Sequence, residues 1–181
     1  MMVESDPKFF DKLESAFKDI ERRELKVGWF EAAKYESGTP VAYVASIQEF
    51  GVPERSIPAR PFMRPTYIAQ INKWRALLDS LIGAALEGKT TITGIFDIVG
   101  KKIVADIRAT IESITSPPLS PITLGARKYR REGKEVTGAT IGEIAQLLKE
   151  DKLDISGVPA KPLDDTHFMI TTLAHITESA K

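Results

Sequence analysis

The side chains best suited to acid–base chemistry lie near the end of the sequence. The chain has two histidines, His167 and His175, and the first directly follows Asp164, Asp165 and Thr166. A carboxylate, a hydroxyl and an imidazole are the groups of a hydrolytic triad, but consecutive residues rarely converge in that arrangement. Asp165 or Thr166 as the N-cap of a helix explains the same letters more simply. A small hydrolase that uses His167 and Asp165 is therefore the least favoured function, and we assign no catalytic residue.

The sequence predicts neither a metal site nor a cofactor site. His167 and His175 are about two helical turns apart, which is too far for both to chelate one ion directly. The chain has no cysteine, which excludes disulfide bonds, cysteine-ligated zinc, iron–sulfur clusters and cysteine nucleophiles. Its glycines are scattered, and no glycine-rich phosphate-binding loop occurs. We expect no bound cofactor and no enzymatic activity.

A basic cluster around Tyr129 is the feature that could contact nucleic acid. Its five members are Arg127, Lys128, Arg130, Arg131 and Lys134. Such cations can bind DNA phosphates, and each contact adds salt-dependent affinity. Glu132 and Glu135 dilute the charge of the cluster, so a solvated loop or a surface for a protein partner is the simpler interpretation.

The segment from Ile57 to Pro65 combines three prolines with two arginines. Proline removes amide donors and restricts the backbone, so we expect a stiff, extended strip. Phe62 is expected to anchor this strip to the core, while Arg60 and Arg64 reach outward or across a subunit contact. In the alternative, the two arginines only pin the strip to its own subunit, with Glu49 as one intramolecular partner.

Length, composition and charge indicate an ordinary globular protein. The 181 residues are 43% hydrophobic and 28% charged, which favours a single domain over residues 1–181. Twenty-five basic residues balance twenty-five acidic ones, so no global field favours nucleic acid or an anionic membrane. No apolar stretch approaches the roughly 20 residues that span a bilayer, and the acidic, polar start does not resemble a secretory signal. We expect a soluble, intracellular protein without a membrane partner.

Two long helices are predicted over Thr66–Glu87 and Thr93–Ile114. The inward residues of the first are expected to be Ile71, Leu78, Leu81 or Ile82, and Ala85. The second has the clearest periodicity in the chain, because six apolar residues recur every three or four positions on one stripe. These residues are Phe96, Val99, Ile103, Ile107, Ile111 and Ile114.

Shorter elements are predicted on both sides of the long helices. A helix capped by Ser5 or Asp6 should end near Arg22, and a second should run from Pro40 to a stop at Gly51. Their apolar faces are Phe9 or Phe10 with Leu13, Phe17 and Ile20, and then Tyr43, Ile47 and Phe50. Between these two helices, Leu25, Val27 and Trp29 alternate with smaller or polar residues, which indicates a strand.

After the long helices, short helices are predicted over 120–131 and 140–150. A further short helix from Leu163 should precede a strand over Thr171–Thr177. The prediction is an α+β fold, in which a small, mainly antiparallel sheet is packed by two long helices and joined by an N-terminal helix.

Three sequence blocks resemble the tail-completion and head–tail joining (neck) proteins of long-tailed bacteriophages and prophages. The first matches the pattern A-x-I-x-E-F-G … I-P-x-R-P-F-x-R-P through Ala45, Ile47, Glu49–Gly51 and Ile57–Pro65. The second, Pro118–Leu124, resembles P-L-S-P-x-T-x, and the third, Lys161–Met169, resembles K-P-L-x-D-T-G-x-M/L. The resemblance spans about residues 41–176. His167 stands where the pattern has glycine, and the helix over 140–150 resembles an insertion.

This resemblance implies a virion structural protein that is assembled in the host bacterial cytoplasm and lies where tail meets head. It implies a ring of identical subunits in contact with tail-tube, tail-terminator or neck/connector proteins, and no catalytic residues. Glu49, Arg60, Phe62 and Arg64 are then expected at a subunit or partner interface. The loop over residues 127–134 would face either DNA in the central channel or the adjacent ring. The alternative function is a DNA- or RNA-binding accessory module that uses the same loop.

Overall fold

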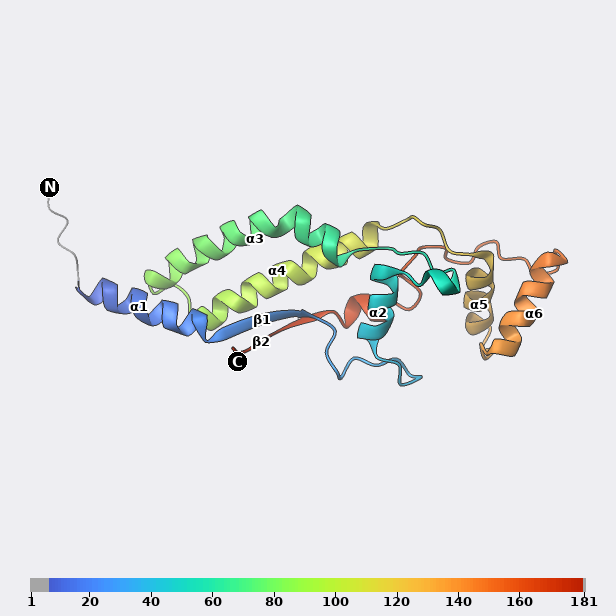
Figure 1. Cartoon of the computed structure of the whole chain (residues 1–181), viewed down its shortest axis with the longest axis horizontal. Helices are drawn as coiled ribbons and strands as arrows, with labels where there is room; N and C mark the ends of the chain where they lie inside the picture. Colours follow the sequence, from blue (N-terminus) through green and yellow to red (C-terminus); the bar gives the residue numbers. More distant parts are fainter. Residues whose placement is uncertain (1–6, 181) are drawn as a thin grey trace.

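A hairpin of two long helices lies against a two-stranded antiparallel ribbon at the centre of an elongated molecule (Figure 1). The computed structural model describes residues 7–180. The hairpin consists of α3 (Met63–Leu86) and α4 (Ile92–Ser113), and the ribbon consists of β1 (Arg23–Gly28) and β2 (Ala174–Ser179). The fold is therefore α+β and mostly helical, as predicted.

The other helices lie at the two ends and along one side of this centre (Figure 1). At one end is α1, and at the opposite end are the paired helices α5 and α6. The bounds are α1 (Pro7–Glu21), α2 (Val41–Phe50), the 3₁₀ turn η1 (Pro53–Arg55), α5 (Pro121–Arg131), α6 (Gly138–Lys149) and α7 (Phe168–Thr171). Within residues 7–180 no helix is both long and apolar enough to span a membrane.

Local capping explains where the later helices begin. The Thr91 hydroxyl accepts a hydrogen bond from the Gly94 amide at 3.1 Å, and Ser120 accepts one from Thr123 at 3.2 Å. Thr137 forms a capping box with Thr140 at the start of α6. Each cap satisfies an amide that has no partner within the helix, so α4, α5 and α6 begin within two residues of their predicted positions.

The two strands come from opposite ends of the described chain. Arg23 pairs with Ser179 and Gly28 pairs with Ala174. The predicted strand at Leu25 and Val27 is confirmed, whereas the second strand begins three residues later than predicted. Both strands contact α4, which closes one face of the ribbon.

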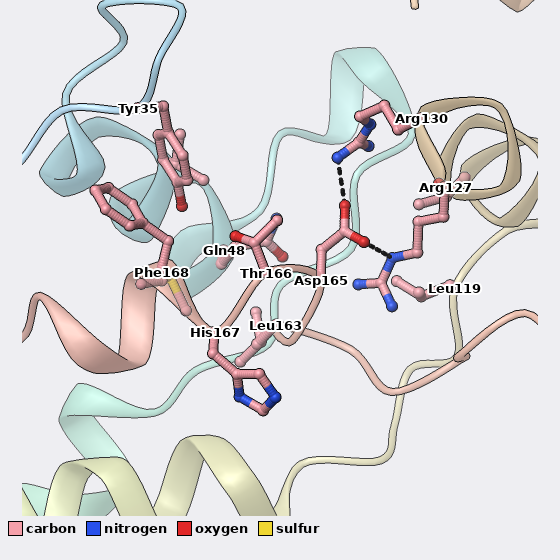
Figure 2. A pocket seen from close by; sticks show the side chains of 13 residues that line it. Tyr35, Gln48, Leu119, Arg127, Arg130, Leu163, Asp165, Thr166, His167 and Phe168 are labelled. Carbon is pink, nitrogen blue, oxygen red and sulfur yellow. Dashed lines mark hydrogen bonds and ion pairs between the residues drawn. The ribbon is translucent and has the colours of Figure 1, made fainter. Parts of the chain in front are cut away.

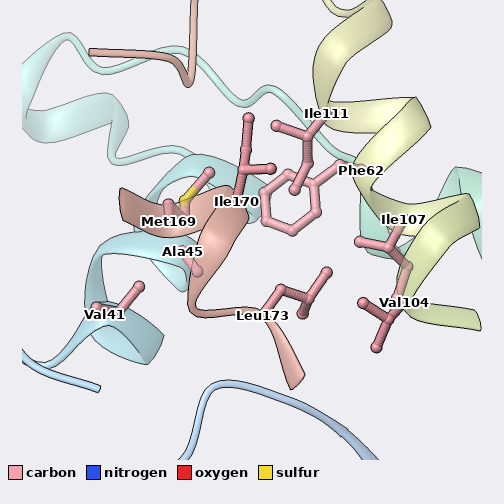
Figure 3. Close-up of a cluster of buried hydrophobic side chains, with 9 residues drawn as sticks. All are labelled: Val41, Ala45, Phe62, Val104, Ile107, Ile111, Met169, Ile170 and Leu173. Carbon is pink, nitrogen blue, oxygen red and sulfur yellow. The ribbon is translucent and has the colours of Figure 1, made fainter. Parts of the chain in front are cut away.

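The central hydrophobic cluster surrounds Phe62 (Figure 3). Phe62 is fully buried, and the Trp29 ring meets it edge-on with centroids 5.8 Å apart. Helices α2, α4 and α7 supply the remaining buried members, which are Val41, Ala45, Val104, Ile107, Ile111, Met169, Ile170 and, just after α7, Leu173. The expectation that Phe62 anchors the proline–arginine segment to the core is therefore confirmed.

Two further clusters lie on either side of this centre. One joins α1, α3 and α4 around Ile92, Ile95 and Val99, and the other joins α5 and α6 around Ala126 and Ile144. The α4 stripe is confirmed by the burial of Val99, Ile107 and Ile111. The single domain over residues 1–181 stays a prediction.

The buried faces of α1 and α2 differ from the predicted ones. On α2 the buried residues are Val41, Ala45 and Glu49, while Tyr43 and Phe50 are exposed. The small Ala45 lets α2 approach the core closely, and the Glu49 carboxylate has backbone donors to meet there. The aromatic side chains Tyr43 and Phe50 therefore point outward.

On α1 the side that packs against the helical hairpin carries Ala16 and Ile20, and Phe10 and Phe17 are exposed. The predicted N-cap at Ser5 or Asp6 and the side chain of Phe9 lie outside the described residues.

The start of α3 also differs from its prediction. The helix begins at Met63, three residues before the predicted cap at Thr66, so Arg64 and Pro65 lie in its first turn and not in an extended strip. Proline is tolerated there because amides of the first turn have no partner within the helix. Thr66 is buried and its hydroxyl bonds to Phe62 O and to Thr110.

Candidate functional site

Glu49 joins the end of α2 to the start of α3. Its buried carboxylate accepts hydrogen bonds from the amides of Phe62 at 2.7 Å, Met63 at 2.9 Å and Arg64 at 3.2 Å. The Arg64 Nε donates to the same carboxylate at 3.0 Å. A residue from one helix therefore caps the next, at the end where the helix dipole stabilises negative charge.

The environment of Glu49 favours its ionised form. Burial opposes the charge, but the amides of Phe62, Met63 and Arg64 and the Arg64 guanidinium outweigh burial, so the pKa of Glu49 lies below its ordinary value of 4.5. The residue is 4% exposed, so its charge interacts with donors of its own chain.

Gly51 lets the chain turn tightly after α2. Its φ is 72°, and a Cβ at this position would lie 2.7 Å from Ala59 N and 2.9 Å from Ile57 O. Only glycine fits both the left-handed backbone and the close approach of the following loop. The predicted helix stop is confirmed, because the Gly51 amide donates to Ile47 O at 2.8 Å.

Arg60 holds the segment that follows α4. Its Nε donates to Pro117 O at 2.8 Å and its Nη2 donates to Pro118 O at 3.0 Å. A third bond reaches the Gln48 side chain at 3.4 Å. The residue is 5% exposed, so the expectation that it reaches outward is wrong. Burial lowers the pKa of Arg60 below its ordinary value, and the nearby positive charge of Arg127 lowers it further.

Glu49, Arg60 and Phe62 are thus satisfied inside their own chain, as in the intramolecular alternative. They hold the neighbouring segments in place and are themselves buried. Arg64 differs from them, because its side chain is largely exposed and its guanidinium lies 4.9 Å from the centroid of the Phe50 ring. Of the four predicted interface residues, Arg64 alone is placed where it could also touch another molecule.

The basic cluster lies mainly on a helix, so its description as a loop over residues 127–134 is wrong. Arg127, Lys128, Arg130 and Arg131 occupy the second half of α5, and Lys134 follows the helix end. The short helix predicted over residues 120–131 is confirmed instead, with Ser120 as its N-cap.

Most of these cations are engaged within the chain. Arg127 is buried and donates to Pro159 O at 2.7 Å and to Lys161 O at 3.0 Å. Lys128 donates to Asp154 O at 2.7 Å, and Lys134 pairs with Glu132 at 2.7 Å. Contact of this cluster with DNA, or with a neighbouring ring, stays a prediction.

A cavity of about 300 Å³ separates α5 from the segment before α7 (Figure 2). Asp165 lies on one wall and pairs with both Arg127 and Arg130. The opposite wall carries Tyr35 and Phe168, whose ring centroids are 5.2 Å apart. One carboxylate thus pairs with two arginines on one wall of a cavity that both polar and apolar side chains line.

The structure does not bring the proposed hydrolytic pair together. The Asp165 carboxylate faces the two arginines, while the exposed His167 ring points away from it (Figure 2). His167 Nδ1 lies 3.0 Å from Asp164 instead. His175 lies elsewhere, 3.1 Å from Asp97 and packed over Gly100. Within residues 7–180 no group of three or more acidic or histidine side chains is arranged to hold a metal ion.

Sequence reasoning missed an exposed apolar surface made by Phe50, Tyr67 and Ile68 with Arg64. Ile68 is 75% exposed and Phe50 is 64% exposed. The position of Ile68 on α3 was the signal for this surface. At four-residue spacing, Ile68 shares a stripe with Arg64 and Asn72 on the polar side of the helix. An isoleucine on that side cannot reach the core.

No protein-family model matches this chain, and no curated protein or solved structure was found to be similar to it.

Proposed function

We propose that this chain is a structural subunit of a tailed bacteriophage or prophage virion that acts in tail completion and head–tail joining as one member of a ring. Its neighbours would be further copies of itself and tail-tube, tail-terminator or neck/connector proteins. The proposal starts from the three sequence blocks that resemble such proteins, and it is supported by where those blocks lie in the fold.

The observation that carries the proposal is that these three blocks meet through two buried arginines. Arg60 of the first block binds the carbonyl oxygens of Pro117 and Pro118, where the second block begins. Arg127, shortly after the second block, binds Lys161 O and pairs with Asp165 in the third block. Segments 34 to 58 residues apart therefore supply partners for one another, which gives a physical reason for their occurrence together and in this order.

The backbone at His167, the residue that departs from the third block, is also consistent with the resemblance. His167 has φ 56° and ψ −2°, which is the left-handed conformation that glycine adopts without steric cost. The pattern K-P-L-x-D-T-G-x-M/L, which the third block resembles, has glycine at this position. The backbone geometry is thus the one that the pattern would require, although the residue differs.

The exposed surface supports a role in assembly. Apolar patches such as the one formed by Phe50, Tyr67 and Ile68 are uncommon on the outside of proteins that act alone. The Glu49 junction holds this patch on two rigid helices, so little conformational entropy is lost when a neighbour covers it. A subunit that works by docking needs such a preorganised surface.

The test is electron microscopy of particles produced after deletion of the gene from its phage or prophage. We expect full heads separated from unattached tails, and we expect the wild-type gene supplied in trans to restore joined, infectious particles. Tails of irregular length would move the proposed role from joining to termination of tail length. Normal infectious particles would overturn the proposal, and a salt-dependent gel shift would then test the DNA- or RNA-binding alternative.

A further inference from the structure

The first half of the inferred contact is the Phe50–Ile68 surface, which we define as Phe50, Arg64, Tyr67 and Ile68. Arg64 lies over the Phe50 ring and precedes Tyr67 and Ile68 by three and four positions on α3. Arg64, Tyr67 and Ile68 are therefore neighbours on adjoining turns of α3, and Arg64 connects them to Phe50 at the end of α2. Because Glu49 caps α3 with the Phe62–Arg64 amides, α2 and α3 present them as one rigid unit.

The second half is the α1 stripe, which we define as Phe10, Leu13 and Phe17. These positions recur at intervals of three and four residues along one side of α1. Phe10 and Phe17 are 55% and 51% exposed, while the residues that pack on the hairpin, Ala16 and Ile20, lie on another side of the helix. One side of α1 thus packs against the helical hairpin, and the α1 stripe lies on another side of the helix.

One molecule cannot bring its own two surfaces together. Ile68 lies near the start of α3, whereas α1 lies beside Leu86 and Thr91, at the other end of that helix (Figure 1). The eighteen residues from Ile68 to Leu86 span about 27 Å of helix. Contact between the surfaces must therefore join two copies head to tail, and such contacts generate rings when the rotation between copies closes.

Charge favours the same pairing. The exposed charged residues on α3 before Asp79 are Arg64, Lys73 and Arg75, and no acidic residue precedes Asp79 on this helix. On α1 the exposed charged side chains that the structure describes are the acids Asp11, Glu14 and Glu21 and one base, Lys18, which pairs with Glu14. Two copies of the Phe50–Ile68 surface facing each other would place like charges together, whereas α1 against α3 places opposite charges together.

The total surface area agrees with two such contacts per chain. The chain exposes 11942 Å², whereas a compact monomer of 20.0 kDa exposes about 8,700 Å². The chain therefore exposes more surface than a compact monomer of its mass, and a ring subunit with two standard interfaces would cover about 1,600 Å² of it.

We infer that the α1 stripe of one copy packs against the Phe50–Ile68 surface of the next copy in a head-to-tail arrangement. The inference rests on the ring-forming part of the proposed function and names the two surfaces that form the ring. Phe17 would lie against Ile68 and Tyr67, and Glu14 or Glu21 would approach Arg64.

The chain has no cysteine, so a disulfide between introduced cysteines can be assigned without ambiguity. The test variant combines Phe17→Cys with Ile68→Cys in the full chain, oxidised with copper–phenanthroline and separated by electrophoresis without reductant. We expect a ladder of covalent multimers, because each chain then links to two neighbours. The matched control combines Phe17→Cys with Ile122→Cys, an exposed position on α5, and should give no ladder.

A second measurement keeps the inference open to refutation if cross-linking disturbs the protein. Ile68→Glu places a charge at an exposed site, so circular dichroism should match wild type while light scattering shows at least a tenfold loss of self-association. The control Ile122→Glu should associate as wild type does.

Three results would overturn the inference. They are a ladder of equal strength in the 17–122 control, efficient dimers from Ile68→Cys alone, or a wild-type chain that stays monomeric while the 17–68 double-cysteine variant gives no ladder. Wild-type rings that form without the 17–68 cross-link would overturn this interface and leave the proposed function intact. Normal particles after gene deletion would overturn the function separately.

Discussion

Arg64 is bound to Glu49 through both its side chain and its backbone. The Arg64 Nε and the Arg64 amide donate to the same carboxylate oxygen of Glu49, at 3.0 Å and 3.2 Å. A second contact runs from Arg64 Nη2 to the Glu49 carbonyl oxygen at 3.3 Å. The pair therefore fixes where α3 begins relative to the end of α2, and it holds Phe50 and Ile68 on one surface.

Replacing Glu49 should destabilise the fold substantially. In Glu49→Gln a neutral amide replaces the carboxylate, so the Phe62 and Met63 amides lose a charged acceptor inside the protein. We expect a loss of about 2 kcal/mol in the free energy of unfolding, measured by urea denaturation. Glu54→Gln is the matched control, because Glu54 is exposed on η1 and should change stability by less than about 0.5 kcal/mol. Equal effects of the two changes would contradict the capping role.

The contribution of Glu49 should also depend on pH in a defined direction. Its folded pKa lies below the ordinary 4.5, so its stabilisation is fully present above that value and is lost as pH falls through the folded pKa. The stability difference between wild type and Glu49→Gln should therefore shrink between about pH 6 and about pH 3. Urea denaturation of both proteins across this range measures the difference, and a gap that widens in acid would refute the assignment.

Arg60 should not tolerate lysine. The guanidinium donates to two carbonyl oxygens and to Gln48 in a fork geometry that a single ammonium cannot reproduce. We expect Arg60→Lys to lower the free energy of unfolding by about 2 kcal/mol. Arg55→Lys, at an exposed position on η1, is the control and should be nearly neutral. A neutral Arg60→Lys would show that the segment after α4 is held by other contacts.

Two glycines with similar φ angles should respond differently to alanine. Gly51 and Gly38 have φ values of 72° and 79°, but a Cβ would collide with Ala59 only at Gly51. Gly38→Ala should cost about 1 kcal/mol from backbone strain alone. Gly51→Ala should cost several times as much, because the loop after α2 must also move. Thermal unfolding of the two variants separates strain from steric overlap, and equal losses would contradict the close approach.

Much of the helical content could be predicted from local sequence. Helix α4 shows its apolar stripe, α5 has the Ser120 cap, and α2 ends at Gly51, because each of these signals acts within a few residues of where it is found. The burial of Phe62 was also predicted, whereas that of Phe50 was predicted wrongly, because residue type alone does not decide which aromatic side chains reach the core. For the candidate site, the sequence predicted which residues matter, namely Glu49, Arg60 and Arg64. It did not predict whether their partners lie in the same chain or in another subunit.

Contacts between distant segments were decided by the tertiary structure alone. The pairing of β1 with β2 joins residues more than 140 positions apart, and Arg127 meets Asp165 across 38 positions. No local pattern encodes such partners. The outward position of Tyr43 and Phe50 has the same origin, because the side of α2 that is buried depends on where α3 and α7 supply backbone donors and apolar neighbours. Local propensity therefore determined which segments are helices, and the packing of distant segments determined which surfaces those helices leave exposed.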